Sequence, residues 1–230
     1  DAEADMPSVV VDETDIGVSG TSSTGVDFTG LFSSDAGADG EKSITYALAA
    51  TDGTSSGLVD SASGQGIYLY MDGDDVVGRV GAEGAADEEG AIAFRISETG
   101  GSLTLTQYSA VVHADATDPD EADAPAMMSG TGLVTLSATI TDNDDDTATT
   151  QTAADITSAF AFEDDGPAIS VDAGADMPSV VVDETDIDAD DGVAGTSSEA
   201  VDFTGLFSSD AGEDGEKSIT YALAATDGTS

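Results

Sequence analysis

The sequence lacks cysteine and tryptophan, and it is poor in basic and aromatic residues. Without cysteine, disulfides, thiolate metal sites and cysteine nucleophiles are excluded. Only 4 Lys and Arg residues stand against 48 Asp and Glu residues, which gives a formal net charge of −44. That charge excludes nucleic acid and anionic membrane surfaces as partners, because polyanions would repel the chain. No apolar run approaches the ~18 residues that a membrane span needs, so direct membrane insertion is not expected.

The acidity itself is a clue to function. A chain with so few cations repels itself when it becomes compact. Bound divalent cations would offset this repulsion, and so would a saline medium that screens the carboxylates. The sequence therefore predicts either specific ion sites or an adaptation to salt.

A long internal repeat is the strongest signal in the chain. The segment Met6–Ile16 returns unchanged as Met177–Ile187, and Val26–Ser55 returns as Val201–Ser230 with one difference. Near-identity over such blocks predicts tandem duplication of a whole domain of about 170 residues, well above the period of a solenoid.

The boundary between the copies is placed at the Asp-Gly-Pro turn that ends at Pro167, although an ordinary internal loop has the same composition. The predicted domains are a complete repeat at residues 1–167 and the N-terminal part of a second, truncated copy at residues 168–230. Missing strands would leave edges of the second copy unpaired, so it is expected to be looser than the first or to pair with another chain.

Alternation of apolar and polar residues predicts β-strands through most of the first copy. The clearest segments are Ser43–Leu48, Ile67–Met71, Ala91–Ile96, Ser102–Thr106 and Val134–Ile140. Turn residues at 72–75 and 99–101 indicate hairpins. The predicted fold is all-β, an immunoglobulin-like β-sandwich with extra strands or loops, in tandem repeats.

The densest acidic cluster follows the last of these strands. Asp142, Asp144 and Asp146 are spaced by two, which places alternate carboxylates on one side of an extended chain. Calcium takes six to eight oxygen ligands, and acidic loops between strands supply them. The alternative is a solvated acidic turn.

A second acidic group surrounds the boundary between the copies. Asp12 and Glu13 follow a valine run, and Asp183 and Glu184 are their repeats. The acidic pair that precedes the boundary is Asp164 and Asp165. A cation that joined these groups would stiffen the connection, whereas strand-end solubility would explain them without an ion. Asp35 and Asp39 form a weaker candidate of the same kind.

Catalysis has little support. His113 is the single histidine and stands beside an apolar run, where a histidine is usually structural. Paired carboxylates are too abundant to single out a glycosidase-like pair, and a zinc site needs more nitrogen or sulfur ligands. The protein is not expected to be an enzyme.

Several motifs together resemble the repeats of giant RTX-type bacterial adhesins. They are Val11–Thr14, Ser43–Leu48, Leu103–Tyr108, Val111–His113, Gly132–Leu136, Thr139–Asp142 and Phe162–Pro167. The resemblance covers the first copy and the start of the second. It implies calcium-rigidified extender domains, secreted by a type I system to the outer surface of a Gram-negative cell. It also implies that the acidic turn and the acidic linker contain the calcium ligands.

On this interpretation the chain is an extender module that spaces a distal ligand-binding region from the cell surface. Its partners would be calcium ions and neighbouring repeats of the same chain, while other domains bind the host or surface ligand. The alternatives are a module of the same protein that binds a sugar or a peptide, and an acidic, salt-adapted domain without specific ion sites.

Overall fold

The computed structural model describes residues 6–114, 124–183, 197–212, 215 and 218–225. The chain divides into two compact units, the first made of residues 1–166 with 212–230 and the second of residues 167–211. The described residues form β-strands and short 3-10 helices without an α-helix, so the predicted all-β class is confirmed. Their helices are too short to span a bilayer.

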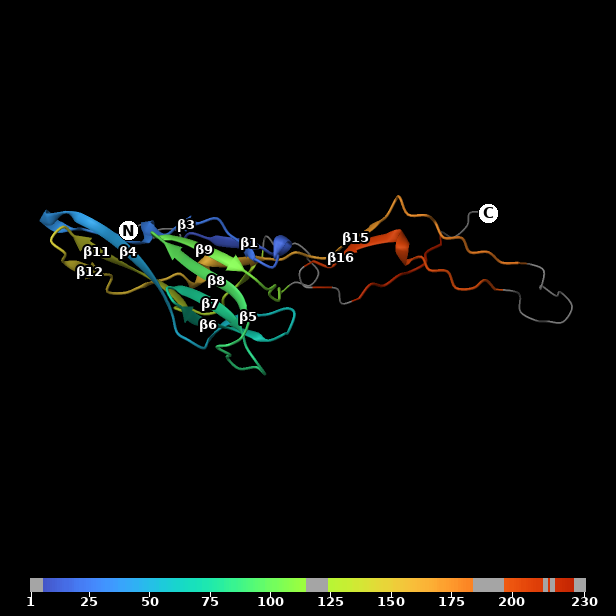
Figure 1. Ribbon diagram of the computed structural model, residues 1–230, viewed down its shortest axis with the longest axis horizontal. Coiled ribbons are helices and arrows are strands. Elements are labelled where there is room, and N and C mark those ends of the chain that lie inside the picture. The colour runs from blue at the N-terminus through green and yellow to red at the C-terminus, as the bar shows by residue number, and fades with distance from the viewer. Residues whose placement is uncertain (1–5, 115–123, 184–196, 213–214, 216–217, 226–230) are drawn as a thin grey trace. The chain divides into compact units, whose positions relative to one another are not determined.

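A seven-stranded sheet forms the larger part of the first unit (Figure 1). Its strands are β2 (Thr21–Ser22), β3 (Val26–Asp27), β5 (Thr54–Val59), β6 (Gly66–Asp72), β7 (Asp75–Val80), β8 (Ile92–Thr99) and β9 (Ser102–Gln107). Strands β5 to β9 pair antiparallel in sequence order, and β2 and β3 add to the free side of β9. The two predicted hairpins are present, with Gly73, Gly100 and Gly101 all at positive φ, as tight turns between antiparallel strands require.

A second sheet is built around the long pair β4 (Glu41–Ala50) and β11 (Val134–Asp142), which lie side by side in Figure 1. The short strands β12 (Thr147–Thr149) and β13 (Ala154–Asp155) pair with β11 on its other side. Each of the five segments with the clearest alternation thus overlaps a strand.

The third sheet places the first strand of the unit beside its last. β1 (Val9–Asp12) pairs in parallel with β14 (Phe160–Glu163), and β10 (Ala126–Met127) pairs antiparallel with β14. The first unit also contains the 3-10 helices η1 (Glu13–Asp15), η2 (Thr29–Leu31), η3 (Gly37–Asp39) and η4 (Thr157–Ala159).

One hydrophobic core joins the three sheets of the first unit. Val9, Leu69, Phe94, Leu136 and Phe162 come from different strands and are all buried in it. The rings of Phe94 and Phe162 pack at a centroid distance of 5.3 Å. The arrangement is that of packed β-layers around a common core, while the immunoglobulin-like assignment stays a prediction.

The second unit is far less regular. Its described strands are β15 (Ala168–Val171) and β16 (Phe207–Asp210), which pair antiparallel, and the 3-10 helix η6 (Thr204–Leu206) precedes β16. Val180 and Val182 are 51% and 49% exposed, although their counterparts in the first copy, Val9 and Val11, are 0% and 3% exposed. A segment of identical sequence is therefore a buried strand in one copy and an exposed coil in the other.

Candidate metal centre

Glu13 is a buried acid that continues the inward-facing row of β1. Side chains alternate along a strand, and here Val9 and Val11 are buried while Val10 is 37% exposed. Glu13 occupies the next inward position and is only 1% exposed. Asp12 faces outward and its Oδ1 accepts a hydrogen bond of 2.8 Å from the backbone N of Thr14, which starts the 3-10 turn η1.

The Glu13 carboxylate is only partly satisfied. Its Oε1 accepts hydrogen bonds from Nε2 of Gln107 at 2.5 Å and from the backbone N of Val111 at 2.9 Å. The second oxygen, Oε2, is buried without a hydrogen-bond partner among the described residues, and so is Oε1 of the fully buried Gln107. Two buried acceptors that lack donors are costly, and a cation or a water molecule would satisfy them.

Asp164 reaches the same place from β14. The parallel register pairs Asp12 with Glu163, so the next two residues, Glu13 and Asp164, leave their strands at the same end. Phe160 and Phe162 form the inward row of β14, and alternation puts Asp164 on that side as well. Its side chain is 12% exposed.

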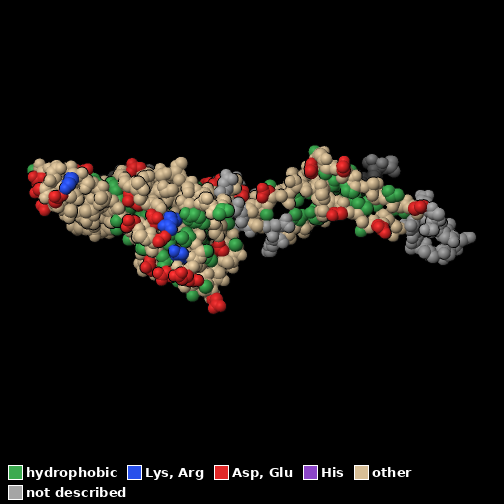
Figure 2. All heavy atoms as spheres, in the orientation of Figure 1, with side chains coloured by type: hydrophobic (Ala, Val, Ile, Leu, Met, Phe, Trp, Pro, Cys, Tyr) green, Lys and Arg blue, Asp and Glu red, His purple; other side chains and the backbone are tan. Residues whose placement is uncertain are grey.

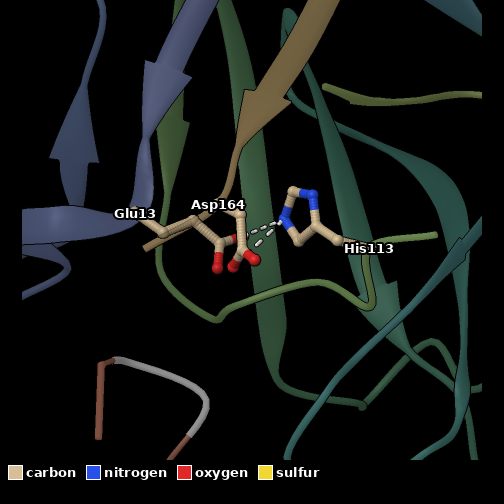
Figure 3. Close-up of side chains that lie close together, drawn as sticks. All are labelled: Glu13, His113 and Asp164. Atoms are coloured by element: carbon tan, nitrogen blue, oxygen red, sulfur yellow. Dashed lines mark ion pairs between the residues drawn. The ribbon is translucent and has the colours of Figure 1, made fainter. Parts of the chain in front are cut away.

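His113 completes this group, which we call the buried triad: Glu13, His113 and Asp164 (Figure 3). It comes from the segment that follows β9, and its side chain is 4% exposed. Its Nε2 lies 3.5 Å from Oε1 of Glu13 and 4.0 Å from Oδ1 of Asp164. The potential ligand atoms of the three residues all lie within 4.8 Å of one another.

The charges of the buried triad favour a bound cation. Two carboxylates this close would repel each other strongly away from water wherever both are ionised, and one imidazole carries at most one positive charge. A divalent ion would balance both and would accept nitrogen and oxygen ligands. The donor set, one imidazole and two carboxylates, fits zinc or manganese better than calcium, which prefers an all-oxygen shell.

A second group, the exposed aspartate group, consists of Asp39, Asp142 and Asp144. The amide of Asn143 joins the turn to η3, because its Nδ2 donates to the backbone O of Asp39 at 2.7 Å. A hydrogen bond with Asp144 lowers the pKa of Asp142 below its ordinary value, and the same hydrogen bond raises the pKa of Asp144. The two pKa values move in opposite directions, as expected when a close pair of carboxyls shares a hydrogen bond. The donor atoms of the exposed aspartate group are all oxygens, and such a set suits calcium.

The predicted ligands therefore belong to two separate groups in the structure. Asp142 and Asp144 do lie together, but with Asp39 as the third member, while Asp146 contributes backbone hydrogen bonds to Asp142. Glu13 and Asp164 do meet, although Asp12 is engaged by its own turn.

The other predicted ligands lie elsewhere. Asp165 belongs to neither group found among the described residues. Asp183 is exposed in the second unit, and Glu184 lies outside the described residues.

Sequence reasoning missed His113 as a member of the site. A lone histidine gives no spacing pattern, and it lies 100 residues along the chain from Glu13. The alternation of Val9 and Val11 did contain one usable signal, because it places Glu13 on the core side of β1.

The acidic surface is the remaining feature of the first unit. On the face shown in Figure 2, acidic side chains are scattered over the surface while basic ones are few. Arg95 of β8 contacts Asp75 of the neighbouring β7 at 2.8 Å and Asp72 at the end of β6 at 2.5 Å. Lys42 pairs with Asp145 in the turn after β11.

The fold and the site define an acidic all-β module with a buried carboxylate–histidine cluster. Residues 8–157 match the model of a domain family of unknown function, DUF5801, and the chain belongs to this family. No curated protein and no solved structure matches the chain.

Proposed function

We propose that the chain is a structural extender module of a large, repetitive bacterial surface adhesin. The observation that carries this proposal is the parallel pairing of β1 with β14. Parallel strands point the same way, so the chain enters the first unit at one end of this pair and leaves it at the other, about 13 Å further along for four residues. Antiparallel terminal strands would return the chain to its starting end.

This geometry suits a tandem array. Successive copies that enter at one end and leave at the other extend in one direction, so each copy adds length. The near-identical repeat in the sequence supports the same function, since duplicated modules are how such arrays grow. The resemblance to adhesin extenders adds secretion and a location on the outer surface of a Gram-negative cell to the proposal.

Bound divalent cations are the second part of the proposal. The buried triad lies where both terminal strands end, so an ion there would bind β1 to β14 and to the segment that contains His113. Calcium is the ion that the exposed aspartate group favours, whereas the imidazole of the triad favours zinc or manganese. An ion at either group would also reduce the repulsion of a chain with a net charge of −44.

The spacer function can be tested by length measurements. Chains with two, three and four joined copies of residues 1–171 would be studied by small-angle X-ray scattering. The maximum dimension should increase by a constant amount for each copy. If the maximum dimension instead increases less with each added copy, as it does when copies fold back on one another, the extender function is refuted.

The ion sites can be tested by thermal unfolding of the full chain. Melts would be compared in EDTA, calcium chloride, zinc chloride and sodium chloride of matched ionic strength. An ion at 100 times its dissociation constant adds about 2.7 kcal/mol, which raises the midpoint by about 5–10 °C for a unit of this size. Equal effects of sodium and the divalent ions would favour the salt-adapted alternative.

Two variants identify which group binds the ion. Glu13→Gln removes one charge from the buried triad and retains an acceptor for Gln107. It should therefore abolish the rise in the unfolding midpoint that the divalent ion produces. Asp144→Asn makes the same chemical change in the exposed aspartate group and serves as the matched control. If only Asp144→Asn loses the rise in the unfolding midpoint, the ion binds in the exposed turn instead.

A further inference from the structure

Gln107 is a fully buried polar side chain at the end of β9. Side chains alternate along this strand, and Leu103, Leu105 and Gln107 form its inward row, all of them 0% exposed. An apolar side chain at this position would extend the core at no polar cost, whereas a buried amide is costly unless its nitrogen and its oxygen both have partners. The contacts of these two atoms therefore indicate what Gln107 does.

The amide nitrogen of Gln107 is fully used. Nε2 donates to Oε1 of Glu13 at 2.5 Å and to the backbone O of Ser109 at 3.1 Å, and an amide nitrogen has two hydrogens. Exchanging the two ends of the amide would turn its oxygen toward these two acceptors, so its orientation is fixed by the hydrogen bonds. The side-chain oxygen of Gln107, Oε1, is left buried without a hydrogen-bond partner among the described residues.

This oxygen lies close to the buried triad. The oxygen and the nitrogen of one amide are about 2.2 Å apart, so Oε1 of Gln107 is no further than about 4.7 Å from Oε1 of Glu13. The potential ligand atoms of the triad lie within 4.8 Å of one another. The second oxygen of Glu13, Oε2, is also buried without a hydrogen-bond partner among the described residues. Two unsatisfied oxygens beside a cluster of acids form an arrangement that a cation would satisfy.

We propose that Gln107 is the fourth protein ligand of the cation at the buried triad and binds it through Oε1. This inference rests on the ion site of the proposed function and adds a residue to it. The four ligands come from four places in the fold: Glu13 follows β1, Gln107 ends β9, His113 lies in the segment after β9, and Asp164 follows β14. An ion held by all four residues would join the two terminal strands to the seven-stranded sheet.

The fourth ligand determines the kind of ion centre. Three protein ligands with an open position are typical of catalytic zinc, whereas four protein ligands close the shell of a structural site. With Gln107 the donors are one imidazole nitrogen, two carboxylates and one amide oxygen, a mixed set that suits zinc and related divalent ions. The centre is therefore structural in kind, and its ion is held within the fold rather than presented to a substrate.

A role through the nitrogen alone is the alternative. Nε2 of Gln107 donates to Glu13 and would hold this carboxylate in place for the ion, as residues outside the ligand shell do at other metal centres. The two roles use different atoms, so two substitutions separate them. Gln107→Glu retains a side-chain oxygen but has no N–H group, and Gln107→Met has neither group while its side chain has a similar length.

The probe is cobalt(II), which accepts the ligands of zinc and whose visible absorption reports the geometry of its ligand shell. Cobalt chloride would be titrated into the full chain in excess magnesium chloride, which screens the acidic surface. Gln107→Glu should bind cobalt at least as tightly as the unmodified chain, because a charged oxygen replaces a neutral one. Gln107→Met should bind cobalt about tenfold more weakly and with a changed spectrum. Gln151→Glu adds the same charge at an exposed position and should leave the affinity unchanged.

Thermal unfolding of the same variants gives a second readout. Gln107→Glu places a third carboxylate at the site, so its unfolding midpoint in EDTA should lie below that of the unmodified chain. Saturating cobalt should restore the midpoint, because the ion neutralises the added charge. Gln107→Met should gain little from cobalt.

Three outcomes would overturn the proposal. They are equal weakening of cobalt binding in Gln107→Glu and Gln107→Met, which would assign the role to the N–H group, unchanged binding in Gln107→Met, and no recovery of Gln107→Glu in saturating cobalt. If Glu13→Gln loses cobalt in these cases, the ion site stands and only the fourth ligand fails. If Glu13→Gln binds cobalt as the unmodified chain does, the ion part of the proposed function at the buried triad fails as well.

Discussion

The two copies of the valine segment allow one stability prediction to be made with an internal control. Val11 is 3% exposed in β1, while Val182, in an identical sequence, is 49% exposed. Val11→Ala removes two buried methyl groups, which costs about 1.6 kcal/mol in transfer free energy. A residual cavity raises the loss to about 2–3 kcal/mol.

Thermal unfolding followed by circular dichroism measures this difference. The midpoint should fall by about 4–12 °C in Val11→Ala and should change little in Val182→Ala. Strand propensity and effects on the unfolded chain are nearly the same at the two sites, so they cancel in the comparison. Equal losses in both variants would refute the argument that the pairing with β14 buries β1.

Three further predictions concern single residues of the first unit. Burial raises the pKa of Asp155, but hydrogen bonds, above all from Thr157, outweigh this and leave the pKa below its ordinary value. Asp155→Asn should therefore cost about 1 kcal/mol near neutral pH, and the cost should vanish as the pH falls through the lowered folded pKa, which urea melts at several pH values would show. Asp145 has φ +77° and pairs with Lys42, so Asp145→Gly in a Lys42→Ala background, which removes the ion pair from the comparison, should stabilise the turn by about 1 kcal/mol, measured by the midpoint of urea unfolding. Gly78→Ala would bring a Cβ to 2.2 Å from the ring of Phe94 and should destabilise the core by about 1–3 kcal/mol; an unchanged melting temperature would contradict this.

Much of the first unit was predictable because its signals are local. Alternation from Ser43 to Leu48 and from Val134 to Ile140 reflects one buried face in each strand, and glycines at the hairpins mark the turns. Local sequence also determines the 3-10 turn after Phe28, because the counterpart after Phe203 has nearly the same backbone angles. In both copies an aspartate accepts a hydrogen bond of 2.8 Å from the threonine that starts the turn.

The remainder depends on contacts that are distant in the sequence. Val9 and Val180 have the same neighbours in the sequence, yet only Val9 is buried. The burial of β1 comes from its pairing with β14, some 150 residues later in the chain. The buried triad has the same origin, since the end of β1, the end of β14 and the segment after β9 come together only in the folded unit. Spacing along the chain could identify Glu13 and Asp164 as acids near strand ends, but not the imidazole of His113 between them.

The parallel pairing of β1 and β14 has a mechanical consequence. A pull on the two ends of the first unit would act along both strands in opposite directions and would load the hydrogen bonds of four residue pairs in shear. Bonds loaded in this way must yield together, whereas antiparallel terminal strands, with both ends of the chain on one side, would unzip one pair at a time. An ion in the buried triad would act at the end of this ladder and would have to be released before the strands could slide.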